Sequence, residues 1–128
     1  MTNKLEELLD NAHSPYYHYK VASIVITNDD KEFKGVNVET SSPAAGMCAE
    51  RNAIYSAISN GYKKGDFKEL HVMVDSDESA EPCFICRQAL VDFTDEHMII
   101  YLYSKKGFDK KVMVQELTPY PFDEGDMK

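Results

Sequence analysis

The sequence contains no long hydrophobic run. Its longest apolar stretch, near residues 21–26, has the length of a strand and falls far short of the roughly 20 apolar residues of a membrane span. The first segment, MTNKLEELLD, is acidic and lacks the basic and then apolar order of a signal peptide. These absences predict a cytoplasmic protein with no membrane partner.

Basic residues are also few. Lysine and arginine number 14 against 22 aspartates and glutamates, which gives a net charge of −8, and the basic residues form no run. Proteins that bind long nucleic acids usually present a basic face, because neutralising phosphates supplies most of the affinity. The charge therefore predicts a small-molecule ligand and no nucleic-acid partner.

Cysteine is scarce, with three residues in the chain. An odd number, together with the lack of a secretion signal, argues against a disulfide framework and for a reducing compartment. All three cysteines lie in two short motifs that are described below.

No internal repeat, low-complexity tract or Gly-, Ser- or Pro-rich linker divides the 128 residues. This length fits one domain and is sufficient to bury a core without disulfides. A hydrophobic fraction of 43% and a charged fraction of 28% are ordinary for a globular protein. We expect a single domain over residues 1–128.

Local patterns predict an alternation of helices and strands. Apolar residues at helical spacing indicate helices, and short β-branched or apolar stretches indicate strands. The expected helices cover residues 3–11, 47–60 and 82–93, and the expected strands cover residues 20–27, 32–38, 70–74 and 98–103, with a last strand at 112–114, a helical turn at 115–117 and an irregular tail at 119–128.

The order of these elements indicates the fold class. The first two strands, joined by a turn at residues 28–30, form an antiparallel hairpin. The helix–strand–helix–strand order in the middle of the chain implies right-handed crossovers and parallel pairing. We therefore expect an α/β fold: a three-layer α/β/α sandwich with a mixed five-stranded sheet and helices on both faces.

Two motifs, CAE at residues 48–50 and PCFIC at residues 82–86, lie at the starts of two predicted helices. One strand separates them, so both helix starts are expected at the same end of parallel strands, where α/β sheets build sites. Cys83 and Cys86 share one helix face, and helix N-termini favour the thiolate form. Three thiolates without a fourth cysteine predict catalytic zinc, which keeps one position for water.

Other interpretations of these residues stay open. A histidine could complete a structural zinc site, although none has ligand spacing to either motif, and the cysteines could instead be unrelated buried thiols or a redox pair. Glu50, beside a metal-bound water, could move a proton, or it could be an ordinary glutamate in a first helical turn. Arg51 could hydrogen-bond to the sulfurs and offset their charge, or it could form an exposed ion pair.

The C-x-E motif followed by P-C-x-x-C is the signature of zinc deaminases. The segments SPYYHYKVAS, FKGVNVET, CAERNAI, PCFICRQAL and VQELTPYPF, in that order, resemble the small homotetrameric cytidine deaminases. The resemblance extends from about residue 14 to residue 126. It implies a cytidine deaminase-like domain that hydrolyses cytidine and 2′-deoxycytidine to uridine and 2′-deoxyuridine with release of ammonia, in pyrimidine salvage.

The resemblance also implies roles at the reacting centre. Cys48, Cys83 and Cys86 would hold one Zn²⁺ per chain, with a water as the fourth ligand. Glu50 would be the catalytic proton shuttle between that water, N3 of cytosine and the leaving ammonia. The backbone of Ala49 would help to hold the base.

Further residues are implied in substrate binding and assembly. Asn37 and Glu39 match the family's ribose-binding N-x-E, and strand alternation sends both side chains to one face. Tyr19 stands where the family usually has a base-stacking Phe, and Tyr16 matches a supporting tyrosine. Phe122 matches an aromatic residue that reaches a neighbouring subunit's site, which implies a homotetramer with shared sites.

One departure and three alternatives accompany this interpretation. Phe84 stands where the family has glycine, which puts the pocket size and substrate range in question. The chain could deaminate another aminopyrimidine nucleoside such as blasticidin S, although Asn37 and Glu39 favour an ordinary nucleoside. It could edit a polynucleotide, which the net charge disfavours. It could be a zinc-stabilised module without catalysis, which Glu50 and the missing fourth ligand disfavour.

Overall fold

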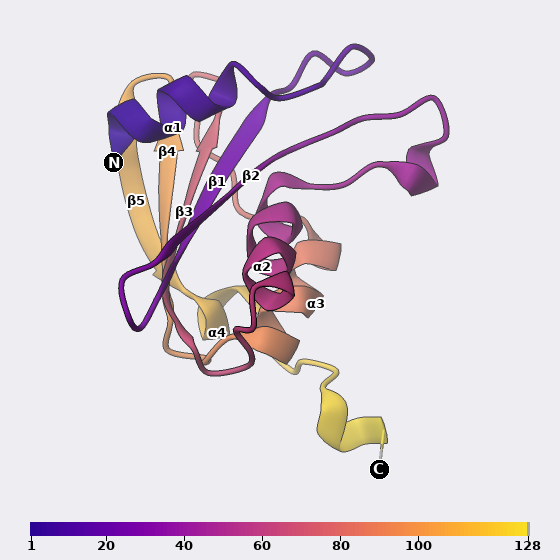
Figure 1. Ribbon diagram of the computed structural model, residues 1–128, viewed down its shortest axis with the longest axis vertical. Helices are drawn as coiled ribbons and strands as arrows, with labels where there is room; N and C mark the ends of the chain where they lie inside the picture. Colours follow the sequence, from indigo (N-terminus) through magenta and orange to yellow (C-terminus); the bar gives the residue numbers. More distant parts are fainter. Residues whose placement is uncertain (128) are drawn as a thin grey trace.

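A five-stranded mixed sheet organises the chain, of which this computed structural model describes residues 1–127 (Figure 1). The strands lie in the order β2-β1-β3-β4-β5. β3 pairs with β4 in parallel, and the other neighbouring pairs are antiparallel. This arrangement confirms the predicted mixed sheet. The strands are β1 (Val21–Thr27), β2 (Glu32–Val36), β3 (Phe67–Val74), β4 (Ile99–Ser104) and β5 (Gly107–Met113).

Helices cover both faces of the sheet. α1 (Thr2–Leu9) lies on one face, and α2 (Ala49–Ser59) and α3 (Phe84–Phe93) lie on the other, so the predicted three layers are confirmed (Figure 1). The side chains of the buried strand β1 alternate between the two faces of the sheet, so this strand contributes to both cores. Val25 belongs to the core beneath α2 and α3, whereas Ile24 belongs to the core beneath α1.

α2 lies unusually close to β2. A Cβ atom at Gly35 would be 2.4 Å from both the Ala49 carbonyl oxygen and the Ala53 amide nitrogen. Only a residue without a side chain permits that approach of backbone to backbone. Gly35 therefore determines how near the sheet the start of α2 can lie.

The C-terminal region differs from the prediction in two respects. β5 begins at Gly107, five residues before the predicted start, because Gly107 makes a tight turn at φ 104° after β4. The first part of this edge strand is exposed and polar, so it lacks the apolar pattern of a buried strand. Val114 opens a short helix, α4 (Val114–Leu117), instead of ending the strand. The tail contains a short 3₁₀ helix, η2 (Glu124–Met127).

The two motif-bearing helices begin later than predicted. Cys48 and Cys83 have extended backbones and are the N-cap residues of α2 and α3, not residues within the helices. Within residues 1–127, no helix is both long and apolar enough to span a membrane.

Candidate active site

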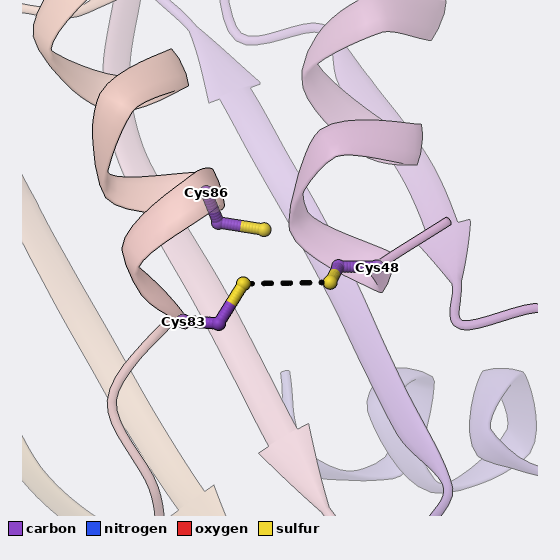
Figure 2. A group of neighbouring side chains, drawn as sticks. All are labelled: Cys48, Cys83 and Cys86. Carbon is purple, nitrogen blue, oxygen red and sulfur yellow. Dashed lines mark hydrogen bonds between the residues drawn. The ribbon is translucent and has the colours of Figure 1, made fainter. Parts of the chain in front are cut away.

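The topology brings the starts of α2 and α3 together. β2 and β3 are both antiparallel to β1, so they run in the same direction. α2 follows β2 through a loop that contains the 3₁₀ turn η1 (Pro43–Ala45), and α3 follows β3. Figure 2 shows the resulting arrangement, in which three cysteine side chains converge from the starts of the two helices.

The three cysteines form a compact group of sulfur ligands. The sulfur atoms of Cys48, Cys83 and Cys86 all lie within 4.8 Å of one another. The Cys48 and Cys83 sulfurs are 3.5 Å apart (Figure 2), and sulfurs that share a tetrahedral zinc at about 2.3 Å lie roughly 3.8 Å apart. In the described chain no histidine belongs to this group. The donor set therefore fits one Zn²⁺ per chain, with a coordination position left for a small ligand.

Arg51 faces the sulfur cluster. Its Nη2 donates to the Cys48 sulfur at 3.5 Å. Hydrogen bonding from the Cys86 thiol, and then from Arg51, lowers the pKa of Cys48 to about 5. The Arg51 Nε is buried without a hydrogen-bond partner, so the guanidinium retains donor capacity toward a centre that carries three thiolates.

Glu50 is a buried carboxyl group beside the cysteines. It is 6% exposed and lies in the first turn of α2. Burial raises its pKa to about 7, a backbone hydrogen bond opposes that shift, and the charge of Cys48 adds to it. A carboxyl group so placed can both accept and release a proton near neutral pH.

These groups open onto one cavity of about 650 Å³. Its volume suits a small-molecule ligand. Phe84, Cys86 and Phe122 do not line it, whereas the other candidate site residues do. Those that line the cavity are Tyr16, Tyr19, Asn37, Glu39, Cys48, Ala49, Glu50, Arg51 and Cys83.

Asn37 and Glu39 project into this cavity and also brace its wall. The Asn37 Oδ1 accepts from the Val21 amide at 2.8 Å, and its Nδ2 donates to the Tyr19 carbonyl at 2.8 Å. Burial raises the pKa of Glu39, but hydrogen bonds from Ser14, Tyr17 and Tyr16 outweigh that effect and lower it below its ordinary value. Glu39 is therefore held as a carboxylate.

Sequence reasoning missed Ser14 and Tyr17, which both contact Glu39. Ser14 precedes a proline and carries only the signal of a helix break. It lies 25 residues from Glu39, and no local pattern brings the two together.

The tyrosines near the cavity differ in exposure. Tyr19 is 39% exposed, and burial, followed by the charge of Glu50, raises its pKa. Tyr19 and Glu50 line the same cavity. Tyr16 is 56% exposed and contributes its backbone amide to Glu39.

Phe122 and Phe84 lie on the surface away from the cavity. Phe122 is 57% exposed, and its carbonyl accepts from Gln88 Nε2 at 2.8 Å. Phe84 begins α3, and the Arg87 guanidinium carbon is 4.3 Å from its ring centroid. The residue that replaces the family's glycine therefore adopts an ordinary helical backbone, and its exposed side chain does not line the chain's own cavity.

Comparison with known proteins agrees with this geometry. The family model of the cytidine and deoxycytidylate deaminase zinc-binding region matches residues 1–102. The chain belongs to this deaminase family. The expectation drawn from the two cysteine motifs is thereby confirmed.

Several relatives of this deaminase span nearly its whole length. A cytidine deaminase of Sporosarcina psychrophila is 32% identical over 118 residues, covering 92% of this chain and 85% of the relative. A probable cytidine deaminase of Dictyostelium discoideum is 38% identical over 117 residues, covering 91% and 77%. The crystal structure of a Burkholderia pseudomallei cytidine deaminase matches with a TM-score of 0.89 at 30% identity, covering 94% of this deaminase and 95% of that chain.

Proposed function

We propose that this deaminase converts cytidine and 2′-deoxycytidine to uridine and 2′-deoxyuridine by hydrolysis, with release of ammonia. One observation carries the proposal: three sulfur ligands within 4.8 Å of one another adjoin the buried carboxyl group of Glu50 on the wall of an open cavity. The names of its relatives support the choice of substrate. Such a reaction serves pyrimidine salvage in the cytoplasm, a compartment that suits three free thiols.

Glu50 moves the protons of the reaction. Zinc held by Cys48, Cys83 and Cys86 supplies Lewis acidity, which lowers the pKa of a water molecule. The Glu50 carboxylate takes a proton from the attacking water and delivers it to N3 of the base as the oxygen bonds to C4. Glu50 then passes the second proton to the amino nitrogen, the C4–N bond breaks, and ammonia leaves.

The remaining residues bind the nucleoside. Asn37 and Glu39 offer a donor and an acceptor to a sugar hydroxyl. The Tyr19 ring stacks on the pyrimidine, and the backbone of Ala49, whose side chain is fully buried, contacts the base. Tyr16 supports the sugar end through its bond to Glu39.

The charges along the cavity favour a nucleoside over a nucleotide. Among the described residues that line it, Glu39, Glu50 and Glu81 are acidic, and the one cation is Arg51, which donates to Cys48. A phosphate in this cavity would meet more carboxyl groups than cations, and Arg51 is already directed to the cysteine cluster. We therefore propose that nucleoside monophosphates are poor substrates.

We propose that residues 1–128 form one domain, since a single sheet supports both core clusters. We also propose a homotetramer in which Phe122 enters the site of a neighbouring subunit. The exposed side chain of Phe122, which lies outside its own cavity, supports this assignment.

The test is ultraviolet absorbance of zinc-loaded protein with cytidine, with the zinc content measured on the same sample. Steady conversion to uridine at about 1 s⁻¹ or faster is expected. Cytidine monophosphate, a cytosine-containing single-stranded oligonucleotide and blasticidin S serve as comparison substrates. Protein that holds one zinc per chain and leaves cytidine unchanged would contradict the proposal.

A further inference from the structure

The segment between α1 and β1 wraps around the carboxylate of Glu39. The Glu39 amide donates to the His13 carbonyl at 2.8 Å. The amides of Tyr16 and Tyr17 donate to Glu39 Oε1 at 3.0 and 3.1 Å, and the Ser14 hydroxyl contacts Oε2 at 2.5 Å. A cavity-lining carboxylate is thus held by a segment some 25 residues away in sequence.

The buried hydroxyl of Ser14 has a determined orientation. A carboxylate can only accept, so Ser14 donates its single proton to Glu39. Its oxygen then accepts from the Tyr19 amide at 2.9 Å. One hydroxyl, 8% exposed as a residue, therefore connects two residues that line the cavity.

The backbone of Tyr19 is held on both sides. Ser14 accepts from its amide, and Asn37 Nδ2 donates to its carbonyl at 2.8 Å. These two bonds orient a residue that lines the cavity together with Glu50. Loss of the Ser14 oxygen would release one of the two constraints.

The carboxylate of Glu39 keeps limited capacity for a ligand. A carboxylate offers about four acceptor sites, and the Ser14 hydroxyl and two backbone amides occupy three of them. Three donors from one segment leave one acceptor site for a substrate hydroxyl and restrict the rotation of the carboxylate.

We infer that Ser14 is a positioning residue of the nucleoside site, whose hydroxyl couples Glu39 at the sugar to Tyr19 at the base. The inference rests on the proposed function. The side-chain hydrogen bonds of Ser14 in the described chain go to these two residues and not to Glu50 or the cysteines. Ser14 therefore acts on substrate binding and leaves the chemical step unchanged.

The test compares Ser14→Ala with Ser14→Thr, which retains the hydroxyl. Ser23→Ala is the matched control, because Ser23 is also buried and hydrogen-bonded but lies in β1 outside the cavity. Ser14→Ala is expected to raise the KM for cytidine and the Kd for uridine about tenfold, with kcat within about threefold of wild type. Ser14→Thr and Ser23→Ala are expected to stay near the wild-type KM.

A double-mutant cycle with Glu39→Gln tests the coupling. The two increases in KM are expected to combine to less than their product, because Ser14 acts partly through Glu39. Multiplicative effects, an unchanged KM in Ser14→Ala, or a loss of kcat or zinc that matches the change in KM would each overturn the inference. If Ser14→Ala does not fold, Ser14→Cys, whose thiol is a weak donor, replaces it in the comparison.

Two readouts separate this inference from the proposed function. Turnover of cytidine by the wild-type protein tests the proposed function alone. Calorimetric binding of uridine tests Ser14 without turnover. Wild-type protein that binds uridine but does not deaminate cytidine would overturn the function, and the ratio of the Kd values would still decide the role of Ser14.

Discussion

Glu50 and its two neighbours in α2 have different environments, because each residue of a helix is rotated by about 100° from the one before it. Ala49 is fully buried, the buried Glu50 lines the cavity, and Arg51 donates to the Cys48 sulfur. Burial raises the pKa of Glu50 to about 7, whereas an exposed glutamate titrates near 4.3. Burial therefore gives this glutamate a different protonation chemistry from that of a glutamate in water.

Replacing Glu50 by glutamine removes the carboxyl group proposed to move protons while nearly preserving its volume. We expect kcat for cytidine to fall by about 10²–10⁴-fold, with zinc content and melting temperature close to wild type. Spectrophotometric turnover and metal analysis measure both. Glu6→Gln, an exposed change on α1, is the control. Turnover near the wild-type rate in Glu50→Gln would refute the shuttle role.

At the scale of secondary structure elements, the contact between β2 and α2 places the site. Gly35 permits the backbones to approach, and the N-terminus of α2 carries Cys48, Glu50 and Arg51. A shift of α2 away from the sheet would move all three relative to Cys83 and Cys86 on the other side of the cluster.

Gly35→Ala tests this contact. The added methyl would lie 2.4 Å from backbone atoms of α2. Because these are backbone atoms, the clash cannot be relieved by the movement of a flexible side chain. We expect a loss of roughly 1–3 kcal/mol in the free energy of unfolding and weaker zinc retention. Denaturant unfolding and metal competition are the measurements, and Lys34→Ala, an exposed neighbour in β2, is the control. Wild-type stability in Gly35→Ala would show that α2 adjusts freely.

At the scale of the whole molecule, a histidine is buried on the α1 side of the sheet, away from the cavity. His71 in β3 is 6% exposed and contacts the Tyr103 hydroxyl at 2.8 Å and Glu69 at 3.1 Å. Burial lowers its pKa and outweighs the opposing effect of Glu69; the N-terminal amine lowers it further and Glu32 raises it. The folded protein therefore favours neutral imidazole.

The lowered pKa of His71 determines how its contribution to the stability of the protein changes with pH. Below the unfolded pKa of about 6.5, the unfolded chain binds the proton more readily than the folded chain, so the contribution of His71 to stability falls on acidification. The contribution of His71 to stability is fully present above that pH. We expect the melting temperature to drop less between pH 7.5 and pH 5 in His71→Gln than in wild type. His97→Gln, at an exposed position, should retain the wild-type drop; an identical drop in all three proteins would contradict the assignment.

The proposed assembly is a second property of the whole molecule. The C-terminal segment extends away from the sheet (Figure 1), and Phe122 is exposed outside its own cavity. We expect Phe122→Ala to lower kcat/KM for cytidine by about tenfold or more, with Tyr120→Ala as the exposed aromatic control. Light scattering measures the mass of each variant. Full activity from a monomeric Phe122→Ala protein would exclude a shared site.

Most of the fold could be predicted because its central elements carry local signals. β1 is a buried apolar strand, α2 has apolar residues at helical spacing, and each lies within a few residues of its predicted range. β5 was placed too late because the first part of this exposed edge strand has no apolar face, and its pairing with β4 provides the order that its sequence lacks.

The sequence alone identified the residues that are proposed to carry the chemistry. Two short motifs contain the three thiols, Glu50 and Arg51, and the order of strands and helices is sufficient to bring two helix starts to one end of a sheet. These signals are local, so they can be recognised without knowledge of the tertiary packing.

The tertiary structure alone decided how the groups behave. The raised pKa of Glu50 depends on the exclusion of water by residues from several elements, which no single segment encodes. The hydrogen bond that Ser14 donates to Glu39 and the one that it accepts from the Tyr19 amide both depend on the segment before β1 packing against the residues that follow β2. Desolvation and long-range hydrogen bonds arise only when distant segments meet. For that reason the sequence identifies the proposed reacting groups, while the fold sets their protonation and orientation.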